Sequence, residues 1–291
     1  MKSKLILVLS TVLLIGAFLL FRSPSVPSVV IPNSEQALER GKYLVAAGGC
    51  VSCHESPEMG GVLSGGMALE SQFGTFFVPN ITPDSVSGIG GWSGEDFIRA
   101  IKHGRSPSGS FYYPAFPYQA YRGMTDDDVL DIASYLLSLE PIEVERSNHQ
   151  LPWWLQRPAM AFWNLLARWS SQPVEVDISA MDDEQAALIA RGEYLARHLG
   201  HCGECHTPRN GVGILRHDLD FAGSEMLEGH VEAINPEALQ GWSREDFDLF
   251  LLIGLKPNGD YVGGKMEPVI EHNTSRLNDY DRKALASFFT R

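Results

Sequence analysis

Cys-Val-Ser-Cys-His at residues 50–54 and Cys-Gly-Glu-Cys-His at residues 202–206 are two copies of one five-residue string. Together they contain all four cysteines of the 291-residue chain, so no cysteine remains for a disulfide elsewhere. In such a string the two thiols lie about one helical turn apart, which matches the two vinyl groups of a haem, and the adjacent imidazole can reach the iron as an axial ligand. The strings therefore predict two covalently bound haem c groups.

The same cysteine spacing also occurs in zinc sites and in thioredoxin-like redox pairs. A zinc site would need a second Cys/His pair nearby, and a redox pair would need a strand–helix–strand context. The sequence around the strings offers neither setting. We therefore assign the cysteines and histidines of both strings to haem attachment and iron ligation: Cys50, Cys53 and His54 to haem 1, and Cys202, Cys205 and His206 to haem 2.

Each string lies in one copy of a longer repeated unit. Arg-Gly-Lys-Tyr-Leu at residues 40–44 matches Arg-Gly-Glu-Tyr-Leu at residues 191–195, an offset of 151, whereas the strings themselves are 152 residues apart. Ser93 and Ser243, 150 residues apart, are each followed three residues later by Asp, which is typical of a capped helix start. Gly- and Pro-rich loops join such helices. The sequence predicts two all-α units of roughly a hundred residues each.

An apolar stretch lies at the N-terminus. Residues 5–21 carry no charge and follow Lys2 and Lys4. This length is long for a signal-peptide core and close to that of a bilayer span. We expect residues 1–30 to form a transmembrane signal anchor and spacer that holds the rest of the chain on the periplasmic side of a bacterial inner membrane. A signal peptide that is removed is the alternative. The expected domains follow at residues 34–141 and 181–291, joined by a linker at residues 142–180.

The charge balance excludes one class of partner. Lys and Arg number 23 against 36 Asp and Glu, which gives a formal net charge of −13. Nucleic-acid binding depends on Lys and Arg that neutralise phosphates, so we expect no nucleic-acid partner. At this length, a hydrophobic content of 44% also argues against intrinsic disorder.

The linker is rich in aromatic residues. Apolar side chains recur at helix-like spacing from Leu155 to Trp169, and Pro158 suits a first helical turn. Trp153, Trp154 and Trp163 accompany them. We expect one amphipathic helix that packs between the two units. Docking of this helix on a dehydrogenase or on a membrane surface is the alternative.

Further strings carry a family resemblance: Pro-Asn-Ile-Thr-Pro at residues 79–83, Gly-Gly-Trp-Ser at 90–93, Tyr-Pro-Ala-Phe-Pro-Tyr at 113–118 and His-Thr-Pro-Arg-Asn at 206–210. With the haem strings, they resemble the dihaem cytochrome c family, in particular the cytochrome c subunits of bacterial periplasmic and membrane-bound dehydrogenases of the alcohol and gluconate type. The resemblance implies two tandem class I cytochrome c-like domains. It also implies a periplasmic dehydrogenase subunit as electron donor and a downstream cytochrome, quinone or oxidase as acceptor.

The sixth ligands of the two irons are expected to differ. Met266 lies in a Gly-Gly-Lys-Met-Glu-Pro segment that resembles the methionine loop of class I cytochromes c, so we expect it to bind the iron of haem 2. At an offset of 150 residues the first unit has Phe116, and a phenyl ring cannot bind iron. Met124 is the nearest substitute for haem 1, although a hydrophobic contact would also explain it. Met59 and Met67 are less attractive candidates.

Phe116 also supports an alternative function. If the sixth position of haem 1 is open, the protein could be a dihaem enzyme such as a peroxidase or a sulfur-compound oxidoreductase. No obvious catalytic His/Arg pair accompanies the substitution. The leading hypothesis is therefore a membrane-anchored dihaem electron carrier of the respiratory chain, in which no residue makes or breaks bonds.

Several other residues are candidates for contacts with a haem edge or propionate: Trp92, Trp242, Asn80, Thr82 and Arg209. For the two tryptophans, ordinary core packing is an equally good interpretation. His149 and His201 have no evident partner, and we expect both at the surface.

Overall fold

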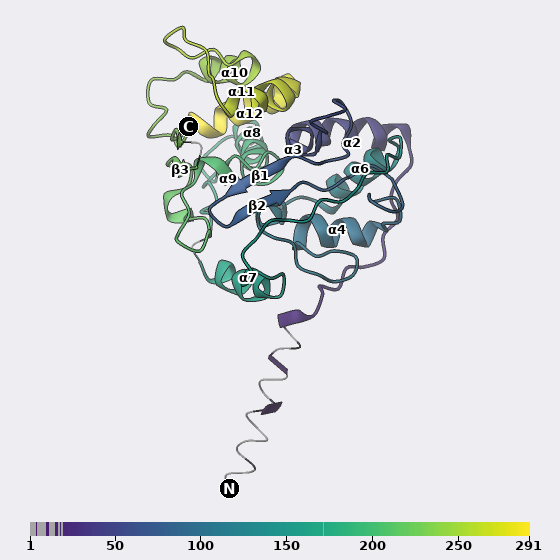
Figure 1. The fold of residues 1–291 in the computed structure, drawn as a ribbon. Coiled ribbons are helices and arrows are strands. Elements are labelled where there is room, and N and C mark those ends of the chain that lie inside the picture. Colours follow the sequence, from purple (N-terminus) through teal and green to yellow (C-terminus); the bar gives the residue numbers. More distant parts are fainter. Residues whose placement is uncertain are drawn as a thin grey trace.

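The computed structural model describes residues 4, 10–11, 15–16, 18, 20–170, 172–227 and 229–291 (Figure 1). The first unit contains the helices α2 (Glu35–Ala47), α3 (Cys50–His54), α4 (Gly94–His103), α5 (Tyr118–Tyr121) and α6 (Asp126–Leu137). Helix α7 (Ala159–Trp169) follows in the linker. The second unit contains α8 (Asp183–Tyr194), η1 (Leu195–Leu199), α9 (Gly203–His206), η2 (His217–Leu219), α10 (Arg244–Ile253), α11 (Met266–His272), η3 (Thr274–Arg276) and α12 (Asp279–Phe289).

The two helix starts that the repeat predicts are confirmed. Ser93 caps α4, because its hydroxyl accepts from the amide of Asp96 and its own amide donates to the Asp96 carboxylate. Ser243 and Asp246 form the same reciprocal pair at the start of α10. Helix α4 ends at Gly104 and α10 ends at Gly254, both in the left-handed conformation. The backbone N–H of each glycine donates to a carbonyl oxygen of the last helical turn.

Two small antiparallel hairpins correct the expectation of an all-α fold. In the first unit β1 (Ala68–Ser71) pairs with β2 (Gly74–Phe77), and in the second β3 (Ser224–Met226) pairs with β4 (Gly229–Val231). Strands of three or four residues are too short to show a clear alternation of apolar and polar side chains, so the sequence pattern did not reveal them. The residue that contacts the histidine of each haem string lies just after the hairpin of the same unit, as described below.

The expectation of an N-terminal transmembrane segment, and with it this part of the fold class, was wrong. Among the described residues, none of the helices has both the length and the apolar character that a bilayer crossing requires. Much of residues 5–21 lies outside the described residues. The uncharged run of seventeen residues is at the short end of the length that a bilayer span needs, so its sequence pattern alone was a weak basis for that expectation.

In each unit the first long helix crosses the last one at a glycine. Helix α2 packs on α6 and α8 packs on α12. A Cβ added at Gly41 would lie 1.9 Å from the backbone oxygen of Asp131, and one at Gly192 would lie 2.1 Å from that of Ala284. The two helix backbones therefore touch directly at the same point of both units, which only glycine allows.

A single inserted residue distinguishes the second unit. The offset between the units grows from 151 at Tyr194 to 152 at Cys202, and the extra residue is accommodated as the π-helical turn η1. This turn places His198 against the first unit, where its Nδ1 lies 2.9 Å from the carbonyl oxygen of Ala120. The space for the ring exists because residue 123 is a glycine, whose Cβ position would lie 2.1 Å from the imidazole.

Two hydrophobic clusters hold the chain together. The larger one is continuous across both units and includes Leu44, Val129, Leu199, Phe247 and Phe288. The second cluster lies under α7 and combines buried side chains of the first hairpin, the segment after α4 and the linker: Phe76, Phe111, Tyr113, Leu155, Met160 and Ala161. The linker is thus packed onto the first unit by a core of its own.

The linker helix differs in extent and orientation from the predicted one. It begins after Pro158, and Leu155 lies in the preceding turn. Phe162, Leu166 and Trp169, which form the predicted apolar stripe, are 59%, 51% and 78% exposed. Met160 and Ala161 are the α7 residues that are buried in the second cluster. The side of α7 that points inward is therefore opposite to the predicted apolar stripe.

We expect Gly41→Ala and Gly192→Ala to lower the free energy of unfolding of the haem-loaded protein by about 1–3 kcal/mol or more each, because the new methyl group forces the crossing helices apart. Denaturant unfolding monitored by circular dichroism measures this. Gly91→Ala is the control, since nothing lies within 4 Å of its Cβ position, and it should stay within about 1 kcal/mol of the wild type. Equal effects of all three substitutions would contradict the close helix crossing.

Candidate haem sites

The first haem string forms the short helix α3, which begins after Gly49 in the left-handed conformation (φ 69°). The second string forms α9, and there the matching position before the first cysteine is His201, also at positive φ (40°). All four cysteines lie in the described part of the chain, and no disulfide joins any two of them. One helical turn separates the two thiols of each string, which is the spacing that attachment to two haem vinyl groups requires.

Both histidine ligands are held by one ring nitrogen. His54 Nδ1 donates to the carbonyl oxygen of Pro79 at 2.8 Å, and His206 Nδ1 donates to that of Glu232 at 2.7 Å. These carbonyls follow β2 and β4, so each hairpin delivers the acceptor for its own histidine. A proton fixed on Nδ1 leaves the lone pair of Nε2 for a metal, which is how iron-binding imidazoles are usually oriented.

Burial acts on the same groups in a consistent direction. It lowers the pKa of His54 to about 4 and also lowers that of His206, so both imidazoles are neutral, as a metal ligand must be. Burial raises the pKa of the Cys50 and Cys202 thiols to about 12. These thiols lie in apolar surroundings that suit a haem edge. Oriented imidazoles and paired thiols therefore fit a covalently attached haem in both units.

The first unit places its ligand candidates in different surroundings. Met124 is buried in the main core, 2% exposed, directly before the capping residue of α6. Phe116 is half-buried, and its ring packs against Tyr112 and Tyr121 at centroid distances of 6.0 and 5.6 Å. Met59 is 49% exposed. Among these methionines, Met124 remains the predicted ligand of haem 1, although its contacts also suit the hydrophobic role.

In the second unit, Met266 is the first residue of α11 and is half-buried. Lys265 and Gly264 before it are exposed, so the methionine emerges from an open loop. The helix that it begins packs against α3 and α10. The helix thus contacts the haem string of the first unit as well as its own unit, and the assignment of Met266 to haem 2 remains a prediction.

The other candidates mainly have structural contacts. Trp92 packs edge-on against Phe97, and Trp242 packs in the same way against Phe247. Asn80 donates to Ser87 Oγ at 2.9 Å and to the carbonyl oxygen of Ile142, and accepts from Thr82. Arg209 pairs with Glu204 inside the second string and donates to the carbonyl oxygen of Gly213. These bonds fix the loops that enclose the strings.

The placement of two histidines at the surface was wrong. His149 accepts from the amide of Phe77 and packs against Phe76 and Tyr113, because its segment runs beside the first hairpin. His201 lies between the units, with its ring 5.3 Å from that of Tyr121. Sequence reasoning missed both because their partners lie 36 to 80 residues away along the chain.

Each haem string faces the opposite unit. Ser52 in the first string donates to Asn273 Oδ1 of the second unit at 2.9 Å. Next to that string, Tyr121 donates to the carbonyl oxygen of Gly48 at 3.2 Å and meets His201, which precedes the second string. A cleft of about 270 Å³ between the units is lined by Phe116 from one side and by Glu204 from the other. The fold thus brings the two strings together across the interface.

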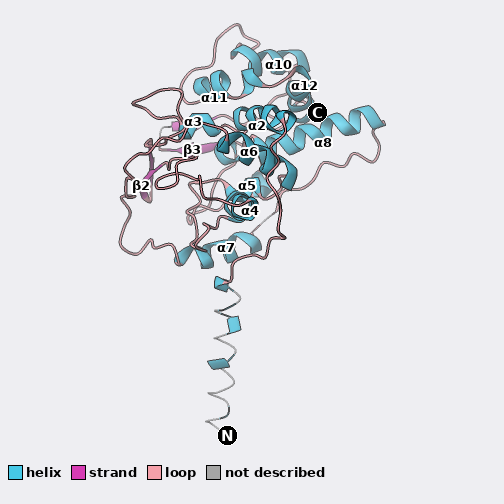
Figure 2. Cartoon of the chain, turned by 90° about the vertical axis from the view of Figure 1, so that its right-hand side faces the viewer, coloured by secondary structure: helices cyan, strands magenta, loops and turns pink. Residues whose placement is uncertain are grey.

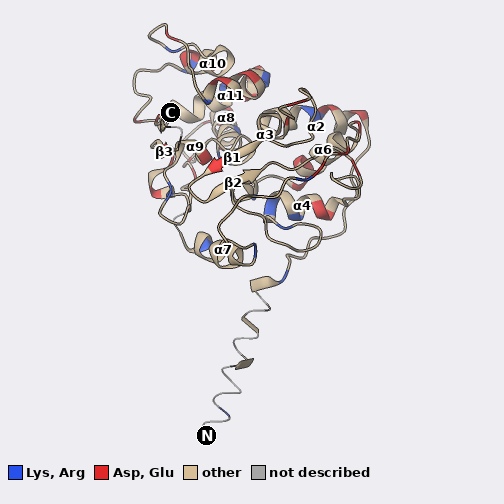
Figure 3. Ribbon diagram, viewed as in Figure 1, with Lys and Arg blue, Asp and Glu red and all other residues tan. Residues whose placement is uncertain are grey.

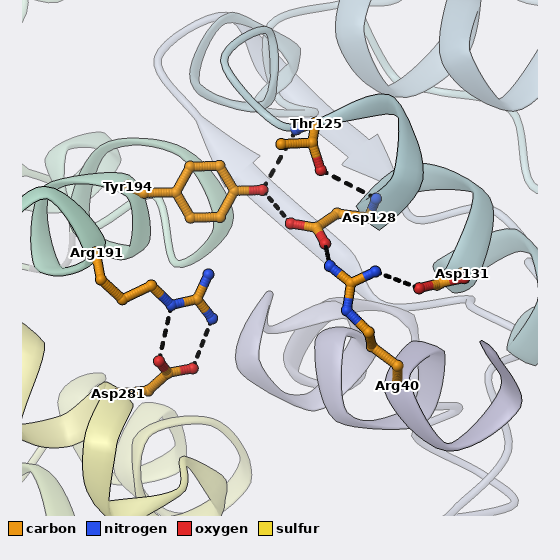
Figure 4. Close-up of polar contacts among 7 residues, drawn as sticks. All are labelled: Arg40, Thr125, Asp128, Asp131, Arg191, Tyr194 and Asp281. Carbon is orange, nitrogen blue, oxygen red and sulfur yellow. Dashed lines mark hydrogen bonds and ion pairs between the residues drawn. The ribbon is translucent and has the colours of Figure 1, made fainter. Parts of the chain in front are cut away.

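A reciprocal pair of contacts locks the units (Figure 4). Arg40 and Tyr194 both bind the Asp128 carboxylate, one from within the first unit and one from the second. Conversely, Arg191 binds Asp281 through two nitrogens at 2.8 and 2.7 Å, and Tyr43 of the first unit donates to the same carboxylate at 2.6 Å. Matching positions of the two units thus exchange equivalent contacts, as in a twofold dimer.

The contacts that lock the two units are buried, and each combines an Asp carboxylate with one arginine and one tyrosine. Asp128 and Asp281 are each 2% exposed. Burial and the Asp281 carboxylate raise the pKa of Tyr43, and burial and Asp128 raise the pKa of Tyr194, so both phenols keep their protons and donate. The duplicated Arg-Gly-x-Tyr segment was visible in the sequence. The carboxylates that it binds were not, since nothing in one unit shows that its tyrosine reaches the other.

Comparison with known proteins places these features in a family. Residues 38–140 match the Cytochrome c family. The "Diheme cytochrome c-type" protein of Cereibacter sphaeroides is 42% identical over 259 residues, which cover 87% of this chain and 84% of that protein. The fructose dehydrogenase cytochrome subunit of Gluconobacter japonicus is 32% identical, covering 96% of this chain and 57% of that subunit. The gluconate 2-dehydrogenase cytochrome c subunit of Pantoea cypripedii is 33% identical, covering 88% of this chain and 59% of that subunit. The chain thus spans less than two thirds of either dehydrogenase subunit.

We expect Tyr43→Phe and Tyr194→Phe each to lower the free energy of unfolding of the haem-loaded protein by about 1–3 kcal/mol, because each removes a buried hydrogen bond to a charged group. Tyr261→Phe, at a 67% exposed position, is the control and should change it by less than about 0.5 kcal/mol. Denaturant titration compares the three. If the first two variants are as stable as the control, the two units are not held by this lock.

Proposed function

This chain belongs to the dihaem cytochrome c family, and from that membership we propose that it accepts electrons from a dehydrogenase on the periplasmic side of a bacterial inner membrane and passes them to the respiratory chain. Its relatives show that the protein carries two covalent haem c groups and transfers electrons without being the catalytic subunit. We propose in addition that the electron donor is a dehydrogenase, that it lies on the periplasmic side, and that the acceptor belongs to the respiratory chain.

The observation that carries the proposal is the matched pair of histidines. In both units a backbone carbonyl oxygen holds Nδ1 of the histidine, so Nε2 can face the iron. Tyrosine–carboxylate contacts join the two units with the haem strings near their interface. The haem supplies one-electron chemistry when bound. The chain attaches it through the cysteines, orients the imidazoles and keeps the two strings at a fixed separation, which sequential electron transfer requires.

Charge supports a protein donor. The net charge of −13 results from 36 acidic against 23 basic side chains. Several acidic residues lie in the first turns of helices such as α6 and α12. Figure 3 shows Asp and Glu at many places on both units. A field of one sign accelerates encounter with a partner of the opposite sign, so the donor should present Lys and Arg at its docking site.

Purification of the detergent-solubilised native protein, followed by identification of the bound partner, tests the proposal. The partner should be a dehydrogenase, and with its substrate it should reduce both haems of this chain in stopped-flow spectroscopy, more slowly at higher salt. A dehydrogenase that reduces an artificial acceptor but leaves both haems oxidised would refute the proposed donor. Rapid turnover of peroxide or of a sulfur compound by the protein alone would instead favour the enzyme suggested by Phe116.

The two irons should differ in their sixth ligands. Met266→Ala should abolish a methionine-to-iron charge-transfer absorption and lower the potential of haem 2, because thioether ligation stabilises ferrous iron. Met124→Leu should produce a high-spin haem 1 that binds carbon monoxide. Met59→Ala, at an exposed position, is the control and should change neither spectrum. Carbon monoxide binding by the wild type would show that Met124 is not a ligand, and an unchanged spectrum of Met266→Ala would exclude Met266.

A further inference from the structure

Large apolar side chains are exposed on and beside the linker helix α7. Phe162, Leu166 and Trp169 share one side of the helix at i, i+4 and i+7. Two tryptophans in the turn before it are also exposed, Trp153 by 86% and Trp154 by 54%. We call these five residues the α7 face. An apolar surface of this size on one element indicates contact with something other than water.

The α7 face is presented by a fixed helix. On its inner side Met160 is buried in the second cluster. Tyr118 of the first unit donates to Asn164 at 3.1 Å, and Trp163 donates to the carbonyl oxygen of Val212 in the second unit at 2.8 Å. Since both units hold the helix, its exposed side is a permanent part of the surface.

The linker helix and the segments beside it carry basic but no acidic side chains. No Asp or Glu occurs in residues 1–34, 97–125 or 147–174, which together contain nine Lys and Arg, counted as three, four and two. Three of these are not free surface charges, because Arg99 and Lys102 pair with Asp96 and Asp126 just outside the segments and Arg105 is buried. All 36 acidic residues therefore lie outside these segments. In Figure 3, α7 shows Arg but no Asp or Glu.

Contacts join the three acid-free segments in space. Arg157 next to α7 donates to the carbonyl oxygen of Phe111 at 2.8 Å. Arg105 donates to backbone carbonyls of the N-terminal segment, including that of Phe21 at 3.3 Å, and the Phe21 and Phe111 rings lie 6.0 Å apart. Two views at right angles show α7 at the end of the molecule where the N-terminal segment joins it (Figures 1 and 2).

We propose that the α7 face adsorbs on an anionic lipid surface. Tryptophan prefers the headgroup level of a bilayer, where its ring is apolar and its N–H remains hydrated, and Phe and Leu beside it can enter the acyl boundary. The acid-free segments would meet the anionic headgroups, which repel the acidic remainder of the molecule. Charge thus favours lipid over a basic protein as occupant. The contact is peripheral and does not depend on the identity of the electron donor.

The direct test uses the full-length, haem-loaded wild type with phosphatidylglycerol–phosphatidylcholine vesicles that contain a lipid with a photoreactive group in its acyl chain. After illumination, mass spectrometry locates the crosslinked peptides. We expect crosslinks within residues 153–169, and fewer of them with phosphatidylcholine alone or at high salt. Crosslinks confined to other parts of the chain would overturn the proposal, even if the protein binds the vesicles.

A pair of matched variants measures the contribution of the face. Phe162→Ser with Trp169→Ser should reduce crosslinking of the linker peptide about tenfold, because two large apolar groups no longer enter the lipid. Leu249→Ser with Ile253→Ser is the control on α10, where both side chains are also exposed, by 39% and 46%, and it should leave the crosslinks unchanged. If the α7 variant retains its crosslinks but is no longer reduced by the dehydrogenase, the face binds protein and the proposal is wrong. Loss of lipid crosslinks with normal reduction leaves the proposed donor intact.

Discussion

Two buried carboxylates, Asp128 and Asp281, hold the two halves of this chain in one arrangement. Each accepts from an arginine of its own unit and from a tyrosine of the other, so the internal contact and the contact between units share one anion. An unpaired buried carboxylate would be costly, and this cost ties the docking of the units to the correct folding of each. The position of one haem string relative to the other follows from that coupling.

The duplication was adapted at the sites where the halves meet. The second unit has one residue more before its string, and the resulting π-helical turn sends His198 into a space left by Gly123 of the first unit. The position of Gly49, directly before the first string, is occupied in the second unit by His201, which contacts Tyr121 across the interface. Both changes break the symmetry of the repeat, and both serve contacts that a single unit could not make.

Each haem string depends on a segment far from it in the sequence. The carbonyl oxygens of Pro79 and Glu232 orient the two iron-binding imidazoles, and a short hairpin brings each carbonyl into place. The linker has a comparable double role, because one side of α7 completes the second cluster while the other side remains exposed. Elements that appear secondary in this fold therefore position the groups on which function depends.

The sequence alone determined the haem strings, the duplication and the capped starts of α4 and α10, because each depends on residues within a few positions of one another. It did not show the hairpins, whose strands are too short to form a pattern, and it suggested a membrane span that the described helices do not contain. It also suggested the wrong buried side for α7. Only the tertiary structure decided these features and the pairing of Tyr43 with Asp281, since such contacts join residues up to 238 positions apart and arise when the units dock.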